Sequence, residues 1–65
     1  MSVLVATRRE AGLTQRQLAE KMGVPHTMVA KVELGERRLD IIEFVALAKA
    51  LKVDPHTLLD RFLSW

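Results

Sequence analysis

A break in an otherwise helical pattern limits the folds open to this 65-residue chain more than any other stretch of its sequence. The segments on either side of Gly23 and Pro25 carry apolar residues at helical spacing. Glycine adopts a positive φ without steric cost, so Gly23 can end one helix. Proline has its φ preset at about −65° and lacks an amide hydrogen, so Pro25 can start the next helix. The sequence therefore predicts two short helices joined by a sharp turn, with Ala19 small enough to let them cross closely.

Local patterns predict an all-α fold in which five helices occupy most of the chain. Aliphatic residues recur at helical spacing, and no stretch shows the alternation of β-branched residues that is typical of a strand. The expected helices run from Ser2 to Ala11, from Thr14 to Met22, from about Pro25 to the residue before Gly35, from Asp40 through Leu51, and from Asp54 through Leu63. The connections between them are short, which forces the helices to pack at steep angles in one compact domain, residues 1–65.

Signals at the helix ends support several of these boundaries. Thr14 and Gln17 have the spacing of a capping box, in which a hydroxyl and an amide satisfy free backbone N–H groups. The Asp40 to Glu43 stretch repeats that pattern, and Asp54-Pro55 suits a cap followed by the first helical residue. In the fourth helix we expect a buried apolar stripe made of Ile41, Phe44, Val45, Ala48 and Leu51.

The composition argues against several classes of protein. The chain has no cysteine, which excludes a disulfide framework or a thiolate metal site, and its two histidines are far apart, so we expect no metal and no cofactor. No apolar run approaches the roughly 20 residues of a membrane span, and the N-terminus lacks the basic region of a signal peptide, so we expect a cytoplasmic protein. The residue sets typical of nucleophilic or acid–base catalysis are missing, so we expect no enzyme.

Charge is distributed unevenly along the chain, although the net charge is only +2. Basic residues outnumber acidic ones from Arg8 to Arg38, whereas acidic residues slightly outnumber basic ones from Leu39 onward. A basic half suggests a polyanionic partner. A solvated surface of mixed charge is the simpler interpretation of charge alone, so the motifs have to decide between the two.

A longer set of motifs carries a resemblance to a known family. The stretch QRQLAEKMGVPHTMVAKV, Gln15–Val32, resembles the helix-turn-helix of the Cro and phage-repressor (XRE-like) DNA-binding domains. The flanking GLT at Gly12–Thr14, ELGERRLD at Glu33–Asp40 and LAKALKVDPHTLL at Leu47–Leu59 continue the match. The resemblance covers nearly the whole chain. It implies a five-helix lambda-repressor-like fold and a sequence-specific regulator of transcription that binds double-stranded DNA, similar to small stand-alone phage-type repressors or restriction-controller proteins.

In this family the third helix enters the major groove and its N-terminal residues reach the base edges. The resemblance therefore implies base contacts from His26, Thr27, Ala30 and Lys31, which face away from the inward valines. Lys31 can donate to guanine, Thr27 can donate or accept, and Ala30 can touch a thymine methyl group. His26 can also be a solvent-exposed residue with no contact, and Met28 is expected to pack against the second helix. Because these positions lack bidentate Gln, Asn or Arg, selectivity can also depend on DNA shape.

Backbone contacts are expected on both sides of that helix. A glutamine at the place of Gln15 commonly holds a phosphate in the family, helped by the helix dipole. Arg16 can add a phosphate contact or remain a solvated surface arginine. Arg37 and Arg38, in the loop after Gly35, are candidate phosphate clamps, with solvated loop charges as the alternative.

Two further family positions bear on stability. Arg8 and Glu33 match positions that the family often pairs in a salt bridge between the first and third helices, and we interpret them as structural. Two residues depart from the family pattern. Pro25 replaces the usual Ser or Thr cap of the third helix, and Thr7 replaces a more usual aliphatic residue, which predicts a weaker core there.

The C-terminal segment and the family both favour a homodimer. Leu58 and Phe62 can serve the core, which leaves Leu59, Leu63 and Trp65 for a dimer interface. Trp65 can instead fold back on its own domain or fray. A dimer would read an inverted repeat. The competing hypothesis is an antitoxin-like module that neutralises a protein partner and binds DNA to autoregulate. Antitoxins usually carry an extra segment, and almost none is expected here. A toxin or polymerase partner is left open.

Overall fold

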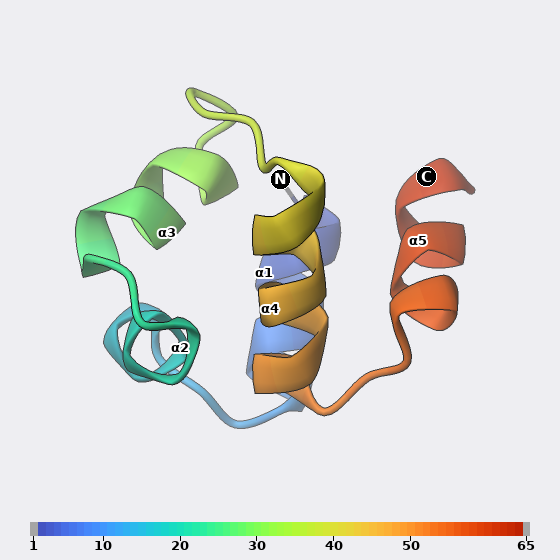
Figure 1. The fold of residues 1–65 in the computed structure, drawn as a ribbon, viewed down its shortest axis with the longest axis horizontal. Helices are drawn as coiled ribbons and strands as arrows, with labels where there is room; N and C mark the ends of the chain where they lie inside the picture. Colours follow the sequence, from blue (N-terminus) through green and yellow to red (C-terminus); the bar gives the residue numbers. More distant parts are fainter. Residues whose placement is uncertain (1, 65) are drawn as a thin grey trace.

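Five short α helices follow one another in the computed structural model, which describes residues 2–64 (Figure 1). They are α1 (Ser2–Glu10), α2 (Gln15–Met22), α3 (His26–Glu33), α4 (Ile41–Leu51) and α5 (Pro55–Leu63). No strand occurs between residues 2 and 64. The predicted all-α class and the predicted order of helices are therefore confirmed, with boundaries within one or two residues of those expected.

The predicted caps start three of the helices. Thr14 Oγ1 accepts a hydrogen bond from the Gln17 amide at 3.1 Å, and Gln17 Oε1 accepts one from the Thr14 amide at 2.9 Å, which completes the capping box of α2. Asp40 and Glu43 form the same box at the start of α4. The Asp54 carboxylate caps α5. A cap such as Thr14 stabilises its helix by about 1 kcal/mol, so local chemistry fixes where these helices begin.

The core lies where α2, α4 and α5 pack around the inner face of α1 and α3. Figure 1 shows α4 between the α2–α3 pair on one side and α5 on the other. Leu18, Leu47 and Leu58, one from each of α2, α4 and α5, are completely or almost completely buried. Phe44 and Phe62 make an edge-to-face contact, with ring centroids 5.6 Å apart, between α4 and α5. These contacts attach α5 to the rest of the fold through apolar burial.

The predicted stripe on α4 is partly wrong. Ile41 is 75% exposed and Val45 is also exposed, whereas Leu47 and Ala50, which the stripe left out, are buried together with Ala48 and Leu51. Nearly every residue of α4 is apolar, so more than one face of the helix has the required spacing. Its neighbours α2 and α5 decide which face is covered, and the sequence of α4 alone does not contain that information.

A weaker core at this point of α1 stays a prediction, but the structure gives Thr7 a role that the sequence did not indicate. Its side chain is buried, with 2% of the residue exposed. The hydroxyl donates to the Val3 carbonyl oxygen at 2.8 Å and accepts from Arg61 Nη1 at 2.9 Å, so both of its hydrogen-bonding roles are used. Arg61 Nη2 also pairs with Glu10 at 3.1 Å. Thr7 therefore anchors α5 to α1, an effect of two residues 54 positions apart in sequence.

Candidate nucleic-acid interface

The turn between α2 and α3 has the geometry that the sequence predicted. Gly23 adopts a left-handed conformation with φ 73° and ends α2, and the Val24 amide donates to the Ala19 carbonyl oxygen at 3.0 Å. Pro25 follows with φ −63° and ψ 145° and is the residue before the first turn of α3, with no side-chain cap. A side chain at position 23 would meet no atom within 4 Å, so the positive φ itself is what requires glycine there.

The two faces of α3 differ in burial and in their partners. Met28, Val29 and Val32 are buried against the core, which confirms that Met28 packs. His26, Thr27 and Lys31 are exposed, and Ala30 is half-buried beside them. Within the part of the chain that the structure describes, no side chain forms a hydrogen bond or ion pair with those three exposed side chains. The four residues predicted to read bases thus share the outer face of α3, where donors and acceptors are available to a ligand.

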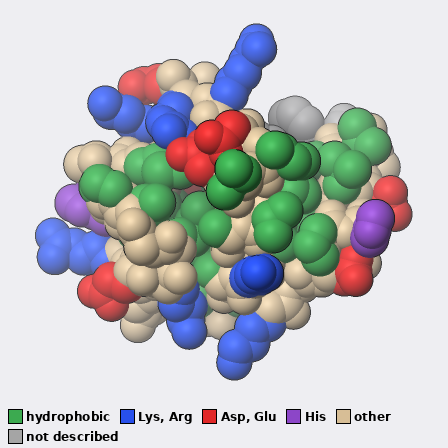
Figure 2. All heavy atoms as spheres, viewed as in Figure 1, with side chains coloured by type: hydrophobic (Ala, Val, Ile, Leu, Met, Phe, Trp, Pro, Cys, Tyr) green, Lys and Arg blue, Asp and Glu red, His purple; other side chains and the backbone are tan. Residues whose placement is uncertain are grey.

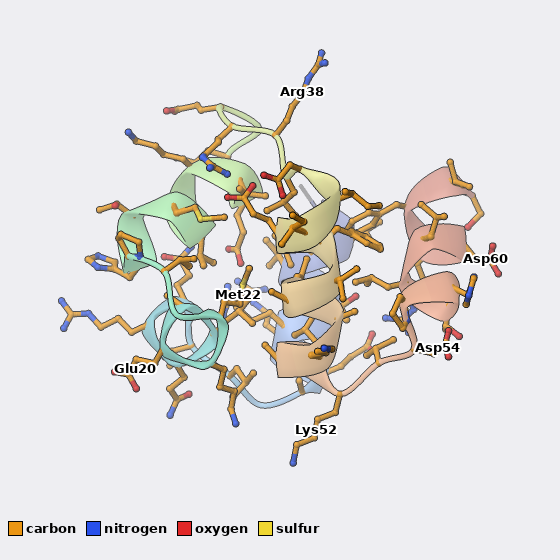
Figure 3. All side chains as sticks on the ribbon, viewed as in Figure 1. Glu20, Met22, Arg38, Lys52, Asp54 and Asp60 are labelled. Carbon is orange, nitrogen blue, oxygen red and sulfur yellow. The ribbon has the colours of Figure 1, made fainter. Side chains whose placement is uncertain are left out.

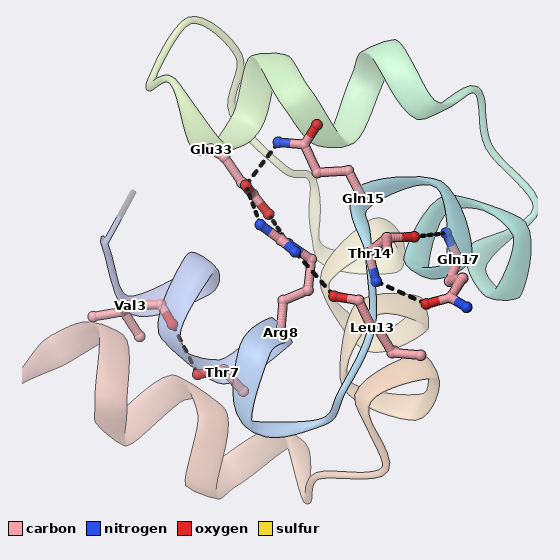
Figure 4. Close-up of polar contacts among 8 residues, drawn as sticks. All are labelled: Val3, Thr7, Arg8, Leu13, Thr14, Gln15, Gln17 and Glu33. Atoms are coloured by element: carbon pink, nitrogen blue, oxygen red, sulfur yellow. Dashed lines mark hydrogen bonds and ion pairs between the residues drawn. The ribbon is translucent and has the colours of Figure 1, made fainter.

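A buried ion pair fixes the C-terminal end of α3 (Figure 4). Arg8 Nε donates to Glu33 Oε2 at 2.6 Å and Arg8 Nη2 donates to Oε1 at 3.1 Å, while Nη1 donates to the Leu13 carbonyl oxygen at 2.9 Å. Only 11% of the Arg8 side chain and 6% of the Glu33 side chain are exposed. Gln15 Nε2 adds a hydrogen bond to Glu33 Oε1 at 2.9 Å. The predicted pair is present, and it connects α1, the start of α2 and the end of α3.

The charge state of Glu33 follows from this setting. Burial on its own would raise the pKa of the Glu33 carboxyl group, but the hydrogen bonds from Arg8 and Gln15, with the positive charge of Arg8, outweigh it. The net result is a pKa below the usual value of 4.5. Glu33 is therefore an anion at neutral pH, and Arg8 has its counter-ion.

The start of α2 presents polar groups beside the outer face of α3. The first turn of a helix leaves backbone N–H groups without helical acceptors, and the dipole favours an anion there. Gln15 is held at this point by its bond to Glu33, and its amide nitrogen carries a second N–H. Arg16 is exposed next to it, and no partner for its guanidinium occurs among residues 2–64. The phosphate contacts expected from Gln15 and Arg16 remain predictions, compatible with this placement.

The two loop arginines, which the sequence did not distinguish, have different environments. Arg37 forms a bidentate pair with Glu43, at 3.1 and 2.8 Å, and also donates to the Arg38 carbonyl oxygen at 3.1 Å. The pairing raises the pKa of Arg37, and the hydrogen bond from Arg37 lowers the pKa of Glu43 below its usual value. Arg38 extends away from the protein (Figure 3), and no described side chain pairs with it. Arg38 is thus available to a phosphate, whereas Arg37 already has an anionic partner.

Comparison with known proteins agrees with this geometry. A helix-turn-helix family model matches residues 4–58, a span that contains all of α2, the turn and α3. This chain belongs to the XRE-type helix-turn-helix family. As a helix-turn-helix protein of this family it is a DNA-binding regulator. No curated protein matches the chain significantly.

Two solved structures resemble this helix-turn-helix protein over most of their length. An XRE-family like protein from Pseudomonas syringae pv. tomato is 40% identical, with a TM-score of 0.83, and the match covers 97% of this chain and 79% of the other. The restriction-modification controller protein C.AhdI from Aeromonas hydrophila is 34% identical, with a TM-score of 0.81, and the match covers 86% of this chain and 85% of that one.

An exposed apolar surface lies away from α3, over α4 and α5. The large exposed side chains there, here called the α4–α5 apolar face, are Ile41, Ile42, Val45, Leu59 and Leu63. Figure 2 shows hydrophobic side chains gathered over these two helices. Leu59 and Leu63 are exposed as expected, and Trp65, the third residue of the predicted interface, lies outside the described residues. The predicted interface contains neither isoleucine, since the predicted stripe of α4 places Ile41 in the core and the sequence pattern gives Ile42 no role.

Residues 2–64 contain no cluster of three or more His, Cys, Asp or Glu side chains that could hold a metal ion. Over the same range, no helix combines the length and the apolar character that a membrane-spanning segment needs.

Proposed function

We propose that this protein is a sequence-specific regulator of transcription that places α3 in the major groove of double-stranded DNA. The observation that carries the proposal is the division of α3 into a buried face and an outer face whose polar side chains have no partner in the described chain. Lys31 and His26 can donate to base edges there, and Thr27 can donate or accept. Ala30 contributes a small apolar surface that suits a thymine methyl group.

Phosphate contacts on both sides of α3 would fix its register in the groove. On one side, Gln15 and Arg16 stand at the N-terminal end of α2, where the backbone and the dipole favour an anion. On the other side, the loop after α3 presents Arg38, which the structure leaves free of described partners. Arg37 is a weaker candidate, because its ion pair with Glu43 would have to break before Arg37 could contact DNA.

We further propose that the protein binds an inverted repeat as a homodimer through the α4–α5 apolar face. Five large apolar side chains in water are unusual for so small a protein and favour burial in an interface. Helix α3 and helix α5 lie at opposite sides of the molecule in Figure 1, so a two-fold axis beside α5 would place the two copies of α3 on the outer sides. Successive major-groove faces are about 34 Å apart, and each monomer, 27 Å in its longest dimension, can span half of that distance.

The likeness to the controller protein C.AhdI, at 34% identity, supports a role of the same kind, namely control of transcription by a small helix-turn-helix protein. On this proposal the protein acts in the cytoplasm without a cofactor and without catalysis. The α4–α5 apolar face also suits a different protein partner, which is the antitoxin-like alternative.

In vitro selection of bound DNA from a random pool tests the proposal directly. A palindromic consensus is expected, and analytical ultracentrifugation should give a dimer both free and on that site. Ile42→Glu and Leu63→Glu, which place charge on the exposed face and not in the core, should give monomers with weakened operator binding. A monomer that selects no sequence would contradict the proposed function, and a wild-type monomer that forms a stoichiometric complex with another protein would favour the alternative.

A further inference from the structure

Two neighbouring residues of α1 reach to two different helices. Successive residues on an α helix point about 100° apart, since a turn takes 3.6 residues. Thr7 accepts a hydrogen bond from Arg61 of α5, and the next residue, Arg8, pairs with Glu33 at the end of α3. Figure 4 shows the Thr7 and Arg8 side chains leaving α1 on different sides, with Arg8 directed at Glu33. Helix α1 thus touches, through directional contacts, both the helix proposed to read DNA and the helix proposed to form the dimer.

The contacts of Arg61 with Thr7 and Glu10 of α1 are directional, whereas the rest of the α5 packing is apolar. Leu58 and Phe62 hold α5 by apolar burial, which depends weakly on small rotations or shifts of the helix. Hydrogen bonds require a narrow range of distance and angle. The Thr7 hydroxyl is buried and has both its donor and acceptor roles filled, by the Val3 carbonyl oxygen and by Arg61. A sliding or rotating α5 would break this bond and leave a buried hydroxyl without its donor.

We propose that Thr7 and Arg61 are positioning residues that set which half-site spacing the dimer accepts. They fix α5 on α1, while the Arg8–Glu33 pair fixes α3 on the same helix, so α1 helps to set the angle and distance between the recognition helix and the part of the dimer interface that α5 contributes. This inference rests on the proposed function, because it requires a dimer that uses α5 and reads two half-sites. Neither residue needs to touch DNA.

The consequence for DNA recognition is geometric. One inserted base pair moves a half-site by about 3.4 Å along the axis and rotates it by roughly 34°. A dimer with a rigid connection between α5 and α3 cannot follow both changes and loses contacts in one half-site. A dimer in which α5 can shift on α1 follows them better, so it distinguishes less between spacings.

The test compares binding to the selected inverted repeat with binding to repeats that have one base pair added or removed at the centre. Wild type is expected to lose at least about tenfold in affinity on the altered repeats, comparable to a mismatched base pair. Thr7→Val keeps the shape of the side chain and removes the hydroxyl, and Arg61→Met keeps the stem and removes the guanidinium. For both variants we expect the affinity for the altered repeats to be less than about threefold below the affinity for the selected repeat.

Matched controls separate positioning from stability. Thr7→Ser restores the hydroxyl and should recover the wild-type preference. Arg9→Met removes an exposed arginine of α1 that has no described partner, and it should also behave as wild type. The affinity for a single half-site and the salt dependence of binding should not change in any variant. Should Thr7→Val fail to fold, Arg61→Met at its partly exposed position still gives the result.

Three results would overturn the inference in distinguishable ways. Folded Thr7→Val and Arg61→Met proteins with the full wild-type spacing penalty would show that the bond does not set the spacing. An equal loss on every repeat would show a purely structural role. Wild-type protein that binds no repeat as a dimer would remove the proposed function itself, and this inference with it.

Discussion

Two arginine–glutamate pairs, one at the end of α3 and one between the following loop and α4, have nearly the same geometry in different surroundings. The Arg8–Glu33 pair has nitrogen–oxygen distances of 2.6 and 3.1 Å, and the Arg37–Glu43 pair has distances of 2.8 and 3.1 Å. Both are bidentate. In the first pair 11% and 6% of the side chains are exposed, and in the second 39% and 21%. The two pairs therefore differ mainly in their access to water.

That difference assigns them different tasks. Breaking a buried pair leaves an uncompensated charge in a medium of low dielectric constant, so the pair is held firmly and its loss is felt by the fold. An exposed pair is screened by water and salt, and either member can exchange its partner at little cost. We expect Arg8–Glu33 to stabilise the arrangement of α1, α2 and α3. We expect Arg37–Glu43 to organise a loop whose arginine remains exchangeable.

The largest expected effect comes from breaking the buried pair. Glu33→Gln removes the counter-ion of Arg8 and should lower the free energy of unfolding by about 3 kcal/mol. That is a large share of the roughly 3–10 kcal/mol expected for a domain of this length. Urea denaturation followed by circular dichroism measures it. The double variant Arg8→Met with Glu33→Leu should recover much of the loss, because an apolar pair leaves no charge unpaired. A Glu33→Gln protein as stable as wild type would show that the pair contributes nothing as an ion pair.

Acid should remove part of the same stabilisation. The pKa of Glu33 in the folded protein lies below its usual value of 4.5, so its contribution is fully present above that pH and is lost as the pH falls through the lower, folded value. The difference in unfolding free energy between wild type and Glu33→Gln should therefore narrow between pH 6 and pH 3. Glu43, whose pKa is also lowered, titrates in the same direction, but as an exposed group its contribution should shrink with added salt. If the difference in unfolding free energy between wild type and Glu33→Gln stayed constant from pH 6 to pH 3, the lowered pKa of Glu33 would be contradicted.

A smaller effect, on binding and not on stability, should separate the two loop arginines. Arg38→Ala is expected to weaken binding to all DNA sequences alike and to reduce the salt dependence of log K by about 0.9, the value for one phosphate contact on duplex DNA. Arg37→Ala should change that slope less, because Glu43 already neutralises the guanidinium. Fluorescence anisotropy over a series of salt concentrations gives both slopes. Equal slopes for the two variants would mean that the exposed pair opens on DNA.

The sequence was sufficient wherever a few neighbouring residues decide the structure. Thr14 with Gln17 and Asp40 with Glu43 start their helices through bonds that span three residues, and the Gly23–Pro25 turn depends on intrinsic φ preferences. The family resemblance supplied the Arg8–Glu33 pair, which spacing alone would not have indicated.

The features that the sequence did not indicate depend on contacts between different elements of the fold. Ile41 fits a buried stripe until α2 and α5 cover a different side of α4. In the sequence Thr7 is a polar residue at a core position without an evident partner. In the structure it accepts a hydrogen bond from Arg61, which is 54 positions away. Arg37 and Arg38 look equivalent in the sequence, but in the folded protein Glu43 lies within hydrogen-bonding distance of Arg37. Arg37 and Glu43 are only six residues apart across the start of α4, so the opposite charges at this short spacing are the sequence signal for this pair.

The smallest expected effect is also the most direct test of the difference between the two pairs. Glu43→Gln should weaken the hold on Arg37 while keeping the capping box of α4, since glutamine suits that position. If the exposed pair competes with DNA for Arg37, this variant should bind DNA slightly more tightly at low salt, with a steeper salt dependence, and its unfolding midpoint should barely move.

Glu36→Gln is the matched control, because it removes a negative charge from the same loop at a residue whose side chain has no described partner. Both variants make the loop more positive, so both can raise affinity through the general field. Only the effect of Glu43→Gln should disappear when Arg37 is alanine, and that coupling is what a double-mutant cycle measures. If the two changes show no coupling, Glu43 does not compete with DNA for Arg37. The greater exposure of the Arg37–Glu43 pair would then not give it a different function from the buried Arg8–Glu33 pair.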